Sequence, residues 1–105
     1  MDEGGASEWS DILGYRDFFD VPRLFWIRSD GGYVLFDSPF LDQIDEYDNY
    51  YSLRFIERDP SELVPTEVSK YSAVGRIPVS SVTFDASRRS KVLVTRELRT
   101  LLQAC

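Results

Sequence analysis

Large apolar side chains are concentrated in one stretch of the chain, residues 23–36, with the sequence RLFWIRSDGGYVLF. Eight of these fourteen residues are large and apolar or aromatic, and they flank the pair Asp30 and Gly31. Asp-Gly is favoured in two-residue type I′ turns, because both central positions need a positive φ. The pattern therefore predicts a β-hairpin in which Arg28 pairs with Tyr33 and the strands continue outward from that pair.

The predicted register places the apolar residues of the hairpin on two faces. The first face carries Phe25, Ile27, Val34 and Phe36, and the second face carries Leu24, Trp26, Tyr33 and Leu35. Moving the turn by one residue would mix polar and apolar side chains on both faces, which favours the first register. A hairpin that is apolar on both faces needs a cover on each side. We expect the C-terminal helix to cover the second face, with a surface for self-association or for a partner as the alternative.

Alternating apolar and polar positions predict further strands. A third strand is expected at residues 50–57 and a short one at residues 91–94. Residues 12–23 read as an extended segment with a bend at Pro22, which cannot donate a ladder hydrogen bond. Residues 76–85 form another extended stretch, and a change of phase at its centre predicts a bulge or break at Ser80 and Ser81.

Two segments carry the signals that start helices. Asp59 precedes Pro60 as an N-cap residue, and the helix that follows is expected to last about one turn because Pro65 limits it. A second helix is expected at residues 95–104, where Thr95 can act as the N-cap. Its leucines share one face at helical spacing and are expected to dock it: Leu98, Leu101 and Leu102.

Together these elements predict a mainly β fold on the border of α+β. A small antiparallel sheet is expected to bend into a partial barrel, with one C-terminal helix. The chain has 105 residues, of which 43% are hydrophobic, which is enough for one core. We expect a single domain over residues 11–105, preceded by a flexible acidic segment at residues 1–10.

The targeting and redox signals of the sequence are weak. Its longest apolar runs, such as LFWI and YVLF, are far shorter than the ~20 residues of a transmembrane helix. Residues 1–10 lack the basic and apolar regions of a signal peptide. The single cysteine, Cys105, cannot form an internal disulfide. These features predict a cytoplasmic protein that does not enter a membrane.

Charge is divided unevenly along the chain. Residues 1–75 carry 6 basic and 16 acidic side chains, whereas residues 76–105 carry 6 basic and 2 acidic ones. In the basic part, Arg88, Arg89 and Lys91 follow an expected turn and are candidates for binding an anion or nucleic acid. A sequence pI near 4.5 disfavours nucleic acid as a partner, and we favour pairing of these cations with the acidic part of the chain.

Candidate catalytic chemistry is limited by the absence of histidine from the sequence. This excludes Ser-His-Asp and Cys-His nucleophiles and the usual zinc ligand sets, and glycine-rich nucleotide motifs are also missing. The acidic segment 37–48 supports one alternative, a carboxylate-based metal-binding protein or small enzyme, through Asp37, Asp42, Asp45 and Asp48. The segment lacks the central glycine and alternating acids of an EF-hand loop, so we expect no metal and no cofactor.

The remaining candidates are surfaces for a protein partner. Tyrosines beside acidic residues are favoured at interfaces, and an uncovered second face would add large apolar residues. The candidate partner-binding residues are Trp26, Tyr33, Leu35, Tyr47, Tyr50 and Tyr51. The sequence therefore predicts a small, non-catalytic interaction or accessory domain that binds a protein partner or a second copy of itself.

Overall fold

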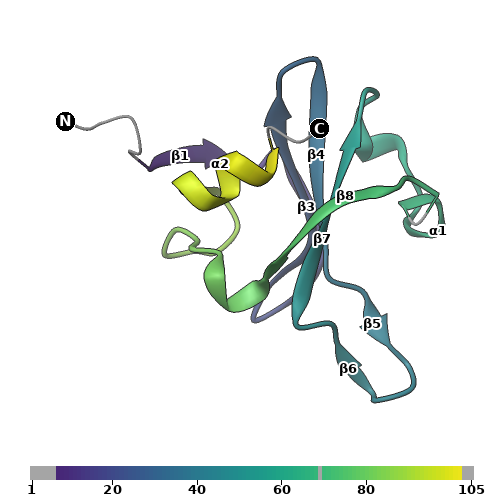
Figure 1. Cartoon of the computed structure of the whole chain (residues 1–105). Coiled ribbons are helices and arrows are strands. Elements are labelled where there is room, and N and C mark those ends of the chain that lie inside the picture. The colour runs from purple at the N-terminus through teal and green to yellow at the C-terminus, as the bar shows by residue number, and fades with distance from the viewer. Residues whose placement is uncertain (1–6, 69, 103–105) are drawn as a thin grey trace.

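A five-stranded antiparallel sheet forms the centre of the protein in a computed structural model that describes residues 7–68 and 70–102 (Figure 1). The strands are β1 (Glu8–Asp11), β2 (Gly14–Phe19), β3 (Val21–Ser29), β4 (Gly32–Asp37), β5 (Phe40–Leu41), β6 (Glu46–Tyr47), β7 (Tyr50–Ile56), β8 (Ala73–Pro78) and β9 (Lys91–Val94). The helical elements are η2 (Pro60–Glu62), α1 (Pro65–Val68), η3 (Val79–Ser81) and α2 (Arg96–Leu102). The sheet runs in the order β2-β3-β4-β7-β8, while β1 pairs with β9 and β5 pairs with β6.

The hairpin of β3 and β4 has the predicted register. Arg28 lies opposite Tyr33, and the pairing continues residue by residue to Leu24, which lies opposite Asp37. Gly31 has a positive φ of 78°, but Asp30 does not, so the expectation of a type I′ turn was wrong although the turn lies where it was predicted. A Cβ atom on Gly32 would come within 2.5 Å of the Ile56 carbonyl oxygen. Gly31 therefore allows the turn, and Gly32 allows β7 to approach closely.

The turn between β2 and β3 is centred on Asp20 and not on Pro22, where the bend was expected. Asp20 has a φ of 66°, a left-handed conformation that aspartate tolerates better than most residues. Phe19 pairs with Val21 across this turn, and Pro22 is a buried residue inside β3. The β4 pairing of β3 begins only at Leu24, so no β4 residue lies opposite Pro22.

Most other expected elements are confirmed. The third strand is β7, the short strand at residues 91–94 is β9, and β8 ends in the turn η3 at the expected break. The Asp59 carboxylate accepts a hydrogen bond from the Ser61 amide and caps η2, and this bond lowers the pKa of Asp59. Thr95 caps α2 by accepting from the Leu98 amide at 3.2 Å. The chain forms a second short helix, α1, starting at Pro65, because proline is tolerated in a first helical turn.

The first face of the sheet is covered by α2 and by the β1–β9 pair. The buried residues of this core are Phe25, Ile27, Val34, Phe36, Tyr51, Leu53, Ile77, Val92 and Leu98. Figure 1 shows α2 and β1 together on one side of the sheet. The leucines of α2 dock as expected, since Leu98 is buried and Leu101 and Leu102 pack against the same core.

The second face is covered within the chain, but not by the C-terminal helix as expected. Its buried core contains Leu24, Trp26, Leu35, Ile56, Leu63 and Val68, with Tyr33 and Tyr71 at its margin. The cover is therefore the segment between β7 and β8, and α1 lies on the opposite side of the sheet from α2 (Figure 1). The helix is already used on the first face, so the expected arrangement was wrong about which element covers which face.

The fold class is confirmed as mainly β with a C-terminal helix. Within the described residues the sheet is open, since its edge strands β2 and β8 do not pair with each other. Of the N-terminal segment that was expected to be flexible, residues 8–10 belong to β1, and residues 1–6 lie outside the described residues, as does Cys105. None of the helices in residues 7–68 and 70–102 has the length and apolar character needed to cross a membrane.

Tyr51 links β7 to the start of β3 through one buried hydrogen bond. Its hydroxyl donates to the Pro22 carbonyl oxygen at 2.6 Å, and burial raises the pKa of this phenol. Tyr51→Phe leaves that buried carbonyl without its donor, so we expect a loss of about 1–3 kcal/mol in the free energy of unfolding. Urea denaturation measures it, and Tyr50→Phe, at an exposed position, should change stability by less than about 0.5 kcal/mol.

Candidate functional site

The second-face candidates for partner binding are not presented at the surface. Trp26 is 5% exposed and Leu35 is 1% exposed, because described residues of the segment 59–71, among them Leu63 and Val68, pack over them. Tyr33 is half-buried, and its hydroxyl accepts a hydrogen bond from Arg28 at 3.2 Å. A partner could reach the two buried side chains only if residues 59–71 moved away.

The three candidate tyrosines near the acidic segment point to different places. Tyr51 is fully buried in the first-face core. Tyr50 is 40% exposed, and the Arg76 guanidinium lies 4.4 Å from its ring centroid. Tyr47 is half-buried in β6 and packs against aromatic residues that sequence reasoning did not select. The structure therefore separates the three tyrosines and gives Tyr47 new neighbours.

These neighbours form a cluster that we call the aromatic end, defined as Phe19, Arg23, Phe40 and Tyr47. The ring of Tyr47 lies 5.7 Å from that of Phe19 and 5.2 Å from that of Phe40, measured between centroids. The Arg23 guanidinium lies 4.9 Å from the centroid of the Tyr47 ring. Phe19 is 59% exposed and Phe40 is 46% exposed. Large apolar area is thus left in solvent at this one end of the sheet.

The β5–β6 hairpin that carries half of this cluster is fixed at its base by a buried serine. The Ser38 hydroxyl donates to the Asp48 carbonyl oxygen at 2.7 Å and accepts from Nη1 of Arg23 at 3.3 Å. The Asp48 amide donates to the Pro39 carbonyl oxygen at 2.8 Å, which closes the hairpin. At its tip, Asp45 has a φ of 56°. Figure 1 shows this hairpin extending beyond the end of the sheet.

Arg23 holds the two parts of the aromatic end together. Its Nε donates to the Phe19 carbonyl oxygen at 3.0 Å, while Nη1 reaches Ser38. The guanidinium also lies against the Phe19 and Tyr47 rings. Such stacking on aromatic faces is favourable for arginine and restricts its motion. The exposed rings of Phe19 and Phe40 are therefore attached to backbone that hydrogen bonds hold in place.

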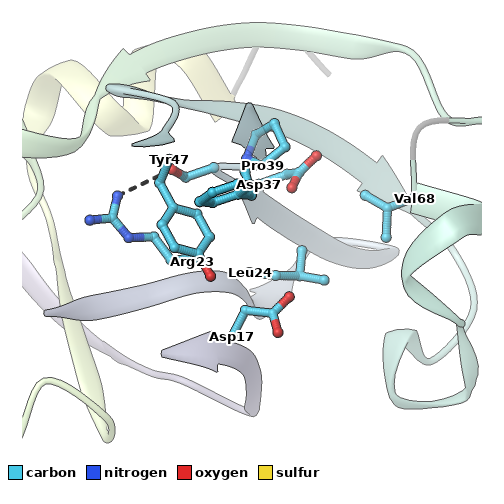
Figure 2. Close-up of a pocket in the computed structure, with 9 residues that line it drawn as sticks. Asp17, Arg23, Leu24, Asp37, Pro39, Tyr47 and Val68 are labelled. Carbon is cyan, nitrogen blue, oxygen red and sulfur yellow. Dashed lines mark hydrogen bonds between the residues drawn. The ribbon is translucent and has the colours of Figure 1, made fainter. Parts of the chain in front are cut away.

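Two hollows of about 430 and about 340 Å³ adjoin the aromatic end, and both are walled by Arg23, Phe40 and Tyr47. The larger hollow also reaches Asp17, Leu24, Asp37 and Val68. Figure 2 shows Asp17 and Asp37 approaching it from different strands, with Arg23 and Tyr47 on one side and Val68 on the other. The smaller hollow is bordered by Phe19, Asp45, Glu46 and Asn49.

The carboxylates around the hollows differ in their partners. Asp37 pairs with Arg54 at 3.5 Å, and the exposed fractions of the two side chains are only 15% and 14%. Burial raises the pKa of Asp37, although the Arg54 charge opposes that shift. Asp17, Asp45 and Glu46 are exposed and have no ion-pair partner among the residues that the structure describes. The hollows therefore carry an excess of negative charge.

The basic candidates Arg88, Arg89 and Lys91 are each engaged separately. Arg88 donates to the Asp20 carbonyl oxygen at 2.9 Å, and the guanidinium of Arg89 lies 4.0 Å from the Phe18 ring centroid. Lys91 forms an ion pair with Asp11 at 2.6 Å. Their loop is organised by Asp85, whose carboxylate accepts hydrogen bonds from Ser87, Ser90 and Lys91 that lower its pKa. The three cations therefore contact three different partners within the chain.

The acidic candidates of the metal-binding alternative are also dispersed. Asp37 pairs with Arg54, whereas Asp48 accepts a hydrogen bond from the Tyr50 amide and lies 3.8 Å from Arg76. Asp42 and Asp45 are exposed along the β5–β6 hairpin. In the described part of the chain, no three acidic or cysteine side chains converge as a metal would need.

Sequence reasoning missed Phe19, Arg23 and Phe40 as surface residues. Phe19 and Arg23 were read as part of an extended segment and of the central hairpin, and their exposure depends on the turn at Asp20. The only signal in the sequence is weak: Phe40 and Tyr47 are separated by six residues, four of them polar. This spacing is compatible with a short hairpin in which the two residues pair, as they do in the structure.

Known proteins offer no guide to this arrangement. No family model matches the sequence, and no match was found among curated proteins or among solved structures. Any function must therefore be inferred from the residues and the geometry of the aromatic end.

Proposed function

We propose that this protein is a small, non-catalytic interaction module and that the aromatic end is the surface through which it binds another protein. The observation that supports this proposal is the exposure of Phe19 and Phe40 side by side with Tyr47, on backbone that hydrogen bonds hold in place. Burial of such rings is favourable, and that free energy is not gained while the rings are exposed to water. A partner that covers the two rings would gain this free energy on binding.

The composition of the aromatic end is also that of a binding surface. Aromatic residues and arginine are enriched at the centres of protein interfaces and often account for most of the binding free energy. Arg23 and Ser38 fix the positions of the rings before any partner arrives. A surface that is already ordered loses less conformational entropy on binding, which increases its affinity.

Site-specific photocrosslinking in the native cell tests the proposal. Replacing Phe19 or Phe40 by p-benzoylphenylalanine keeps an aromatic ring in place and captures whatever lies against it. We expect one discrete product from positions 19 and 40, and none from Leu13 or Val74, which are exposed elsewhere. Adding Tyr47→Ser should reduce the product at least about tenfold, as for loss of an interface hot spot.

Two results would contradict the proposal. Equal yields from all four positions would show that the aromatic end has no preference over other exposed apolar side chains. A product with twice the mass of the chain, in which mass spectrometry finds peptides of this chain alone, would identify a second copy, and not a different protein, as the occupant. The Tyr47→Ser protein must keep its circular dichroism spectrum and melting temperature, so that a lost product reports on contact and not on folding.

A further inference from the structure

The two hollows beside the aromatic end contain unbalanced negative charge next to exposed aromatic rings. Asp17 borders the larger hollow, and Asp45 and Glu46 border the smaller one. All three carboxylates are exposed and lack an ion-pair partner in the described residues. The Phe40 side chain lines both hollows, and the Phe19 side chain lines the smaller one. The surface thus combines two groups that attract cations.

Among the described residues, Arg23 is the only basic side chain that lines either hollow, and neighbouring groups fix its position. Its Nε donates to the Phe19 carbonyl, its Nη1 donates to Ser38, and its face lies against Tyr47. Arg54 is committed to Asp37. Arg88 is hydrogen-bonded to the Asp20 carbonyl and does not line the hollows. The partners of Arg23 are neutral groups, so this residue keeps one positive charge beside the three exposed carboxylates of Asp17, Asp45 and Glu46. The surface therefore keeps an excess of negative charge.

We infer that the occupant of this surface is a basic peptide segment of the partner protein, an inference that rests on the proposed function. Its arginine or lysine side chains lie on the exposed rings of Phe40 and Phe19, where the ring faces attract a cation. Their charged ends reach the carboxylates of Asp17 in one hollow and of Asp45 and Glu46 in the other. Arginine fits this surface better than lysine, because its planar guanidinium can stack on a ring and bind a carboxylate at the same time.

The shape of the surface supports a segment and not a single small cation. The hollows lie on either side of a shared wall made by Arg23, Phe40 and Tyr47. One extended segment that crosses this wall can place a basic side chain into each hollow. An acidic segment would instead meet an excess of exposed carboxylates, and such like-charge contacts reject wrong partners.

A titration of the isotope-labelled full chain with model peptides tests the inference. The probes are the amidated octapeptides (Gly-Arg)4, (Gly-Glu)4 and (Gly-Asn)4, followed by amide chemical-shift changes in NMR spectra. We expect (Gly-Arg)4 alone to bind, with the shifts concentrated in residues 17–23 and 37–49. Binding should weaken as salt rises from about 50 to about 200 mM, because the carboxylates are exposed and screened.

Paired charge variants separate local recognition from general attraction by an acidic protein. Asp45→Asn with Glu46→Gln should weaken (Gly-Arg)4 binding about threefold to tenfold, which corresponds to the loss of two exposed ion pairs. Asp30→Asn with Glu57→Gln makes the same charge change at the opposite end of the sheet and should alter the affinity less than about twofold. Asparagine tolerates the positive φ of Asp45, so the backbone is kept.

The inference is overturned if (Gly-Glu)4 or (Gly-Asn)4 binds as well as (Gly-Arg)4, if the shifts spread over all acidic surfaces, or if both double variants weaken binding equally. Its failure can be distinguished from failure of the proposed function. A photocrosslinked partner whose linked segment contains no lysine or arginine would contradict the inference alone. Absence of any crosslinked partner, with (Gly-Arg)4 still binding locally, would contradict the proposed function and would leave standing only the preference of this surface for basic segments.

Discussion

Phe25→Ala is expected to lower the free energy of unfolding by about 3–5 kcal/mol, the usual cost of removing a buried aromatic side chain. Phe25 has 0% exposure in the first-face core. Its ring stacks on Phe36 at 4.4 Å and meets Tyr51 and Phe84 edge to face at 5.4 and 5.5 Å. Alanine would remove all three ring contacts at once. The cavity would open between β3, β4 and β7, where the surrounding sheet can relax only partly.

Urea denaturation followed by circular dichroism measures this loss. Phe19→Ala is the matched control, because Phe19 is the same residue type on the neighbouring strand and is 59% exposed. The control should cost less than about 0.5 kcal/mol, as for other surface substitutions. Since a domain of this kind is stable by roughly 5–15 kcal/mol, the Phe25 variant should have a clearly lower urea midpoint. A loss below about 1 kcal/mol would mean that the first face is not the principal core.

The hairpin of β3 and β4 was predictable because two independent local signals agree on it. The Asp30-Gly31 pair fixes the turn, and alternation around it fixes which side chains share a face. A slip of one residue would have moved polar side chains into a core that contains Phe25 and Val34. The observed register is therefore the only one of the two considered that keeps both faces apolar.

The cover of the second face could not be predicted in the same way. It depends on Leu63 and Val68, which belong to a segment with short apolar runs and two prolines. The expected cover, α2, had a clear amphipathic pattern, but an amphipathic helix can dock on either face of a sheet. Contacts between distant segments decide the matter, such as the hydrogen bonds from Arg16 to the carbonyls of Leu63 and Ser61.

The aromatic end was hidden for a different reason. β5 and β6 have two residues each, which is too short for a period-2 pattern to be recognised. Their position depends on the partly buried hydrogen bonds of Ser38, and serine at that position gives no signal in the sequence. Tyr47 was selected from its acidic surroundings alone. Its packing with Phe19 and Phe40 comes from the three-dimensional arrangement.

The second-face core leads to the other large expected effect, which concerns Trp26. Its side chain is 5% exposed beneath residues 59–71 and packs closely against β2, since a Cβ on Gly14 would meet it at 2.3 Å. Trp26→Glu would place a carboxylate in this core. The Arg16 guanidinium lies 6.0 Å from the ring centroid and already donates to two backbone carbonyls. The new carboxylate would therefore be buried without an ion-pair partner.

Burial of an unpaired charge costs several kcal/mol, a large part of the roughly 5–15 kcal/mol that keeps a small domain folded. We expect Trp26→Glu to be largely unfolded at 25 °C, with collapsed dispersion in its amide NMR spectrum. Trp9→Glu makes the identical exchange at a side chain that is 51% exposed and should leave the spectrum dispersed. A folded, monomeric Trp26→Glu protein would contradict the packing of residues 59–71 over this face. A charge at this position is tolerated only if solvent reaches it. The second face would then be exposed and would again be a candidate surface for a partner.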